Sequence, residues 1–381
     1  MTLLLAGALL LLSPAAARAQ SLDAELAPAV DALFDLQLDT AAALARRAAA
    51  DHPGHPAPAF YEAMVEYQKW AFDPEGPAAP PKALEDALAR TESLAVDWES
   101  TSTVEGLYYY GAARGFAGRV LADRGHWFKA AAPGLRAIRA LRRAQAMDPA
   151  LVDADLGIGM YDYFRSQMPA AAKPFAFLFT FDTGSRERGL KELTTVAYGG
   201  GLAKAEAQNV LSAIYVSEDE REFGQAAALL SALSARYPHN PAFRMRLGYA
   251  ELRLGHWDQA IAADEPDGPW LEALDPRVRE QARQDALYRA AEAALFAGRY
   301  AQAAGWLDAL AKLSPARPLD DWTTLRRANL CDAQGRREEA LALYRKSASG
   351  PVRAVAEGFL QAPFPDGPKD VKPWSGLELP R

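Results

Sequence analysis

Histidine is the first residue type to consider, because paired histidines can hold zinc or transfer protons. The chain has only five, His52, His55, His126, His239 and His256. No two of them lie four residues apart on one predicted helix, which is the spacing of a helical zinc site. Three of the five flank prolines at predicted helix ends, which favours solvated turns over metal ligands. The sequence therefore predicts no metal site.

Motifs for nucleophilic catalysis or nucleotide binding are absent as well. The chain contains no G-x-S-x-G and no G-x-x-x-x-G-K-S/T, and no glycine-rich turn follows a predicted strand. Gly111, Gly115 and Gly118 lie within a helical period, so they favour close helix packing over a phosphate loop. Arg186 to Arg188 open a predicted helix, where they could bind an anion, and are interpreted instead as solvated capping charges. We expect no catalytic residue, no cofactor and no enzymatic activity.

Composition and charge limit the classes of partner. The 381 residues carry a formal net charge of −7 with acidic and basic residues mixed along the chain. A protein that binds nucleic acid usually carries a basic stripe, and none is present. Cys331 is the only cysteine, so an intramolecular disulfide is impossible, and its apolar neighbours predict a buried thiol.

The N-terminus has the pattern of a signal peptide. An apolar run from Leu3 to Leu12 precedes Ser13-Pro14 and then Ala17-Arg18-Ala19, which fits a cleavage site after Ala19. The run is about half of the ~20 residues that a spanning helix needs. Residues 1–19 are therefore predicted to direct export to the periplasm or cell envelope, and the abundance of Ala, Arg, Gly and Pro favours a bacterial source.

Short motifs recur along the second half of the chain. One unit has Leu247-Gly248 followed by Gly255-x-Trp257-x-x-Ala260. Two further copies are Gly298-x-Tyr300-x-x-Ala303 with Pro315, and Phe223-x-x-Ala226 with Pro238. Phe223 and Trp257 lie 34 residues apart, which is the period of the tetratricopeptide repeat.

On these motifs residues 223–346 resemble tetratricopeptide repeats, and residues 27–71 resemble a degenerate opening repeat and a half. The resemblance implies paired antiparallel helices that bind other macromolecules. Leu38 and Arg337 replace the usual aromatic residue, and Glu251 stands at another aromatic position. These departures predict less regular packing of the helices that carry them.

The middle of the chain resembles a second group. Residues 150–201 contain Leu156-Gly157-Ile158-Gly159, an aromatic run and a Gly-x-Arg-Glu-x-Gly-Leu helix start. This order is similar to the eukaryotic family of mitochondrial outer-membrane and inclusion-body-associated tetratricopeptide proteins. The similarity implies a shared helical scaffold and no particular activity.

Together these patterns predict an all-α fold, an α-α superhelix of roughly sixteen helices. The expected divisions are a signal peptide (1–19), degenerate N-terminal repeats (20–100), a long-helix central region (101–201), C-terminal repeats (202–350), and a short helix with a proline-rich tail (351–381). Residues 72–81 and 264–276 are interpreted as surface insertions. Residues 362–381 hold five prolines and are expected to be extended or disordered.

The first helix of each repeat usually lines the concave face, where repeat proteins bind extended ligands. This register predicts nine partner-contacting residues: Ile158, Tyr161, Asp162, Met245, Tyr249, Leu252, Arg253, Tyr288 and Glu292. Each of them could instead pack between repeats. The expected function is that of an exported, non-enzymatic scaffold that binds protein or peptide partners.

An aromatic run in a connection between helices suggests the alternative function. Phe175, Phe177, Phe179 and Phe181 alternate along the sequence and follow no helical face. They either close the interior of the solenoid or form an exposed apolar patch that contacts a partner or a membrane surface. In the second case the chain is a lipid or transport accessory protein, with peripheral contact to a membrane.

Overall fold

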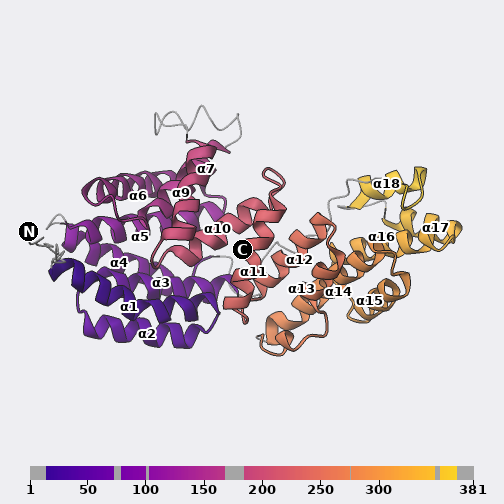
Figure 1. Ribbon diagram of the computed structural model, residues 1–381, viewed down its shortest axis with the longest axis horizontal. Helices are drawn as coiled ribbons and strands as arrows, with labels where there is room; N and C mark the ends of the chain where they lie inside the picture. Colours follow the sequence, from indigo (N-terminus) through magenta and orange to yellow (C-terminus); the bar gives the residue numbers. More distant parts are fainter. Residues whose placement is uncertain are drawn as a thin grey trace, which may run out of the picture. The chain divides into compact units, whose positions relative to one another are not determined.

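The computed structural model describes residues 14–72, 79–99, 103–167, 184–274, 276–347 and 352–366. Within these ranges the chain forms seventeen α-helices and one short 3-10 helix, and no strand (Figure 1). Most neighbouring helices pair in chain order, as the repeat pattern predicts. The prediction of an all-α solenoid is confirmed. The run from Phe175 to Phe181 lies outside the described residues.

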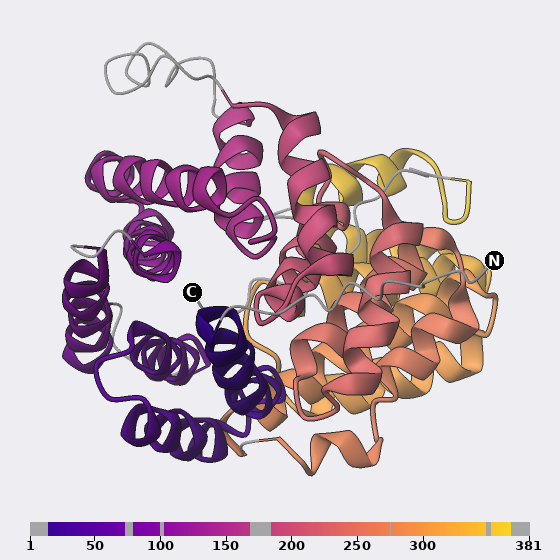
Figure 2. The same ribbon diagram turned by 60° about the vertical axis from the view of Figure 1, so that its left-hand side comes forward.

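The helices fall into two compact units, which divide between Lys204 and Ala205. Figure 2 shows the helices of unit 1, in indigo to magenta, following one another in chain order from α1 and α2 to α6. The helices of unit 1 are α1 (Pro14–Phe34), α2 (Leu38–Asp51), α3 (Pro56–Ala71), α4 (Lys82–Glu99), α5 (Val104–Asp123), α6 (Trp127–Met147), α7 (Ala154–Ser166) and α9 (Arg186–Gly199).

Unit 2 continues the pairing. Its elements are α10 (Lys204–Tyr215), α11 (Phe223–Arg236), α12 (Pro241–Leu254), α13 (Trp257–Asp264), the 3-10 helix η1 (Pro269–Leu271), α14 (Pro276–Phe296), α15 (Tyr300–Lys312), α16 (Leu319–Ala333), α17 (Arg337–Ser347) and α18 (Arg353–Gln361). An apolar core that includes Leu307, Leu325, Cys331 and Phe359 runs through α14 to α18. The buried thiol of Cys331 matches the expectation from its neighbours.

The turn inside several helix pairs requires left-handed backbone. Glycines with φ between +73° and +76° occupy this turn in four pairs: Gly125, Gly255, Gly298 and Gly335. A residue with a Cβ loses roughly 1–2 kcal/mol in this conformation, which explains the glycine two positions before the second helix. Leu36 and Arg221 adopt the same conformation before α2 and α11 without being glycine.

Close packing of α5 on α6 depends on a missing side chain. A Cβ at Gly111 would lie 2.7 Å from Cγ of Leu141 and 3.1 Å from the carbonyl oxygen of Ala137. At Gly118 it would lie 3.4 Å from the carbonyl oxygen of Ala130. The glycines of α5 therefore allow tight helix contact, as predicted.

The stretch after α13 differs from the simple surface insertion that the sequence suggests. Asp264 is only 1% exposed, and its carboxylate fills the space that a Cβ on Gly248 would need. Trp270 and Leu271 are buried against Ala286 of α14. Burial of a tryptophan and a leucine holds much of this stretch onto unit 2.

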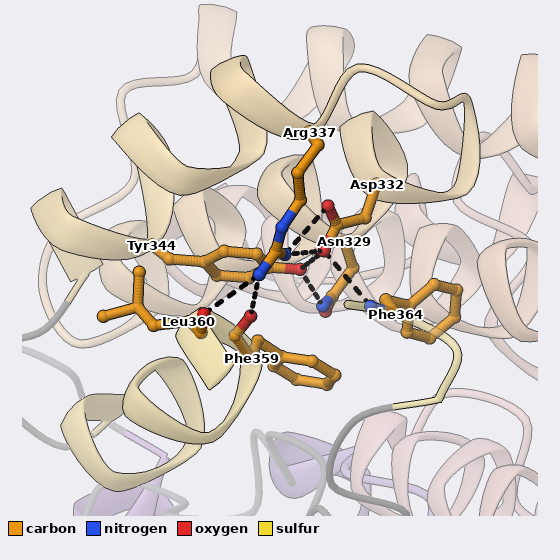
Figure 3. Close-up of polar contacts among 7 residues, drawn as sticks. All are labelled: Asn329, Asp332, Arg337, Tyr344, Phe359, Leu360 and Phe364. Carbon is orange, nitrogen blue, oxygen red and sulfur yellow. Dashed lines mark hydrogen bonds and ion pairs between the residues drawn. The ribbon is translucent and has the colours of Figure 1, made fainter. Parts of the chain in front are cut away.

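The C-terminal end of unit 2 is fastened by one arginine (Figure 3). Arg337 begins α17, and its Nη1 donates to both carboxylate oxygens of Asp332, at 2.8 and 3.0 Å. Its Nη2 donates to the carbonyl oxygens of Phe359 and Leu360, at 2.9 and 3.0 Å. These carbonyls lie in the last turn of α18, where a cation is favourable.

The same aspartate holds the chain beyond α18. Oδ2 of Asp332 accepts hydrogen bonds from the hydroxyl of Tyr344 at 2.9 Å and from the backbone N–H of Phe364 at 3.1 Å. The ring of Phe364 is buried. Residues 362–366 are therefore anchored, contrary to the expectation of an extended or disordered tail, and residues 367–381 lie outside the described residues.

None of the described helices is long and apolar enough to cross a membrane. Helix α1 begins at Pro14 and continues past Ala19, the predicted cleavage position. Export and cleavage after Ala19 remain predictions.

Candidate binding site

Polar groups from four different helix pairs converge in unit 1. The members are Asp23 on α1, His55 just before α3, Tyr61 on α3, Glu105 and Tyr108 on α5, and Asp153 at the start of α7. We call these six residues the unit 1 cluster. Helices α1, α3, α5 and α7 are the first helices of their pairs. The repeat register predicts that the first helices form the ligand-binding surface.

Aromatic rings near the cluster pack against one another. The ring centroids of Tyr108 and Tyr109 lie 4.8 Å apart, and those of Phe60 and Tyr61 lie 5.5 Å apart, both edge to face. The ring of Phe60 is 6.0 Å from that of Tyr109. Tyr61 and Tyr109 are only 7% and 6% exposed, whereas Asp23 is exposed. The carboxylates of Asp23 and Asp153 thus lie close enough to this packed aromatic group for their charges to act on Tyr61 and Tyr108.

The carboxylates crowd one another. Although the residue is exposed, neighbouring side chains partly desolvate the carboxyl group of Asp23. This desolvation, and then the negative charges of Asp153 and Glu105, raise its pKa to about 6, while His55 opposes the shift. Burial, and then the carboxylates of Asp153 and Asp23, raise the pKa of Tyr61 and Tyr108 well above the usual value for tyrosine, so both phenols stay neutral. A cation in this cluster would relieve the repulsion between the carboxylates.

Two of the carboxylates are held in place. Oδ1 and Oδ2 of Asp153 accept hydrogen bonds from the backbone N–H groups of Gly201 and Ala203, at 2.7 and 3.1 Å. Nε2 of His55 lies 3.5 Å from Oε2 of Glu105. The imidazole is only 11% exposed, so His55 is not the solvated turn residue that the sequence suggests. The cluster is therefore largely preorganised.

This arrangement is suited to binding. Across the described residues, no group of three or more His, Cys, Asp or Glu side chains could hold a metal ion. Carboxylates close to tyrosine rings suit a lysine or arginine side chain, because the carboxylates can pair with its charge and the rings can contact its stem. The chemistry that the cluster offers is recognition of a cation.

The predicted contact residues on α7 lie elsewhere in unit 1. Ile158 is 3% exposed and Asp162 is fully buried, while Tyr161 is half-buried. Nη2 of Arg188 donates to Oδ1 of Asp162 at 2.8 Å, and a second hydrogen bond joins Nε to Oδ2. Arg188 is exposed, as expected of a solvated charge, and it also pairs with Asp162 across α7 and α9.

The predicted residues on α12 contact one another and α11. Met245, Tyr249 and Leu252 are between 2% and 5% exposed. Nη1 of Arg253 donates to the hydroxyl oxygen of Tyr249 at 2.8 Å, and the guanidinium lies 4.3 Å from the ring centroid of Phe223. The structure thus places all of them within the packing of unit 2.

Tyr288 and Glu292 on α14 are buried completely. The hydroxyl of Tyr288 donates to Glu292 at 3.2 Å, and Nε of Arg326 donates to the same carboxylate at 2.6 Å. These two residues belong to a buried polar network. The role of all nine residues in binding a partner remains a prediction.

Sequence reasoning missed the unit 1 cluster. Asp23 and Asp153 lie 130 positions apart, and no motif links them. The available signal was the three consecutive tyrosines at 108–110, together with one acidic or histidine residue at the start of each of α3, α5 and α7. That signal needs a register for α1 and α3, and the degenerate opening repeats supply only part of it.

Stacked pairs of antiparallel helices define a helical repeat protein. A family model described as tetratricopeptide repeat matches residues 219–263, which include α11 to α13. The match agrees with the tetratricopeptide motifs that the sequence shows around Phe223 and Trp257. No curated protein sequence matches it significantly.

Several solved tetratricopeptide structures are similar to this chain at low identity. The yeast Tom70 structure has 11% identity and a TM-score of 0.33, over 87% of this chain and 86% of that chain. The tetratricopeptide domain of P58(IPK) has 16% identity and a TM-score of 0.24, over 86% of this chain and 83% of that chain. A yeast Sti1 domain, solved in a complex with pHSP90, has 17% identity and a TM-score of 0.24, over 87% of this chain and 99% of that chain.

Proposed function

We propose that this chain is a non-catalytic scaffold, and that its unit 1 cluster binds a lysine or arginine side chain of a protein partner. The tetratricopeptide repeat matched at residues 219–263 supports a role in protein interaction. The observation that carries the finer proposal is Asp23, an exposed carboxylate whose pKa is raised to about 6 beside Asp153 and Glu105. A partner's cation supplies the countercharge that the cluster lacks.

The test is a direct binding measurement. The probe is a short fluorescent peptide that alternates lysine with alanine, and the reference peptide has glutamine in place of lysine. We expect the lysine peptide to bind at low salt. The double variant Asp23→Asn, Glu105→Gln should weaken it at least about tenfold, because hydrogen bonds between charged groups contribute roughly 1.5–3 kcal/mol.

Asp39→Asn is the matched control, because it removes an exposed carboxylate from α2, outside the cluster. Equal binding by the double variant and this control would refute the assignment of the cluster. Failure of the parent protein to bind the lysine peptide would refute it too.

We also propose that the chain is exported and cleaved after Ala19, on the strength of the N-terminal pattern. Mass spectrometry of the mature protein from the native cell should give the mass of a chain that begins at Gln20. A mass that includes residues 1–19 would contradict the proposal.

A further inference from the structure

A small pocket lies between the first turns of α5 and the middle of α6 in unit 1. Its volume is about 190 Å³. Its lining residues are Leu107, Tyr110, Arg136, Arg139, Ala140 and Arg143. Leu107 and Ala140 are buried and belong to the local apolar core, with Tyr110 packed against them. The floor is therefore apolar and the rim is basic.

The rim is made by one face of α6. Arg136, Arg139 and Arg143 recur at spacings of three and four residues, which places them side by side on the helix. All three are exposed. This concentration of positive charge occurs in a chain whose net charge is −7, so an acidic partner would be attracted here rather than to the protein as a whole.

Two of these arginines differ from their neighbours in lacking an internal carboxylate. Arg114 on α5 pairs with Glu92, and Arg142 on α6 has its Nη2 3.6 Å from Oδ1 of Asp162. In the part of the chain that the structure describes, neither Arg136 nor Arg139 forms an ion pair. Their guanidinium groups are available to an external anion.

The size of the pocket limits what can enter it. Clefts that enclose a small-molecule ligand usually measure about 300–1,000 Å³, and this pocket is smaller. It has room for one side chain. The planar guanidinium fork matches a carboxylate with two parallel hydrogen bonds, while the apolar floor accepts the methylene groups or an aromatic neighbour.

We propose that the pocket between α5 and α6 binds a glutamate or aspartate side chain from an acidic segment of a partner protein. This site is independent of the unit 1 cluster, because its charge is opposite and its residues are different. Unit 1 would then hold a partner through two contacts of opposite charge.

Fluorescence anisotropy with the full chain tests the proposal. The probe is a short fluorescein-labelled peptide that alternates glutamate with phenylalanine, and the reference peptide has glutamine in place of glutamate. The double variant Arg136→Gln, Arg139→Gln should weaken binding of the glutamate peptide at least about tenfold. Arg46→Gln, which removes an exposed arginine from α2, should leave it within about twofold.

Three results would overturn the proposal. The first is failure of the parent protein to bind the glutamate peptide. The second is equal binding of the glutamine peptide, and the third is binding of the glutamate peptide by the double variant as tightly as by the parent. Inorganic phosphate at equal concentration should not displace the peptide, and displacement would assign the pocket to phosphate instead. The variant Asp23→Asn, Glu105→Gln should bind the acidic peptide as the parent does, which separates this outcome from that of the lysine peptide.

Discussion

At the scale of single residues, the surroundings of Glu192 on α9 disfavour ionisation of its carboxyl group. Burial, and then the charges of Asp162 and Asp155, raise the pKa of Glu192 to about 7. Its Oε2 atom is buried, with no hydrogen-bond partner among the described residues. Because the folded-state pKa exceeds the unfolded value of about 4.3, this group stabilises the fold at low pH, and the contribution is lost as the pH rises through about 7.

We therefore expect Glu192→Gln to raise the thermal midpoint at pH 8 and to change it little at pH 5. The carboxyl is partly exposed, so screening by solvent should limit the gain in the free energy of unfolding at pH 8 to about 1 kcal/mol. Thermal unfolding followed by circular dichroism at both pH values measures it. Glu187→Gln, an exposed position on the same helix, should give no such pH-dependent gain. A loss of stability in Glu192→Gln at pH 8 would contradict the argument.

Asp23 makes a second prediction at this scale. Its pKa of about 6 means that the carboxyl is charged above pH 6 and neutral below it. Affinity for a lysine peptide should therefore fall as the pH drops from 7 to 5. Bound cation lowers the pKa of the carboxyl, so the midpoint in the complex should shift downward. In Asp23→Asn the loss of affinity between pH 7 and pH 5 should be smaller. An unchanged loss would assign the pH dependence to another group.

At the scale of helices, the α5–α6 contact predicts opposite effects for two glycine substitutions. Gly111→Ala would force a methyl group against Leu141 and the Ala137 backbone, so we expect a loss of about 1–3 kcal/mol. Gly134 lies within α6, and a Cβ added there would meet nothing within 4 Å. Gly134→Ala should therefore raise the free energy of unfolding by about 0.5–1 kcal/mol. Urea titrations measure both changes, and a neutral Gly111→Ala would show that the helices separate easily.

The helices themselves were largely predictable, because each signal was local. A left-handed glycine followed by an aromatic residue marks the start of α13 and α15, and Phe223 marks that of α11. Burial of the predicted contact residues was not predictable in the same way. Tyr288 and Glu292 lie in a buried network in which Arg326 of α16 pairs with Glu292. The spacing of residues within a repeat does not predict that partner.

At the scale of the whole molecule, the unit 1 cluster arises only from stacking. Its residues come from four helix pairs, and the stack brings together groups that the sequence separates by up to 130 positions. The buried position of Asp264 in unit 2 has the same origin. Its carboxylate fits against Gly248, which has no side chain, and accepts a hydrogen bond from Nε of Arg289 at 2.8 Å. Sites built between repeats are therefore harder to predict than the repeats themselves.

A solenoid also needs a closed end, since a terminal repeat has a neighbour on one side only. At the last described helix of this chain, Arg337 joins Asp332 to the last turn of α18. The side chain of Asp332 is fully buried and that of Arg337 is 31% exposed. Arg337→Gln would leave a buried carboxylate without its cation, which costs about 3 kcal/mol.

We expect Arg337→Gln to lower the free energy of unfolding by about that amount, and to speed hydrogen exchange in α18 more than in α14. Arg336→Gln is the matched control, because Arg336 is an exposed neighbour that pairs only with Glu339 and Gln334 among the described residues. Its cost should stay below about 1 kcal/mol. Hydrogen exchange followed by mass spectrometry reports on both variants. Equal protection of α18 in both would mean that apolar packing of Phe359 and Phe364 closes the solenoid without the arginine.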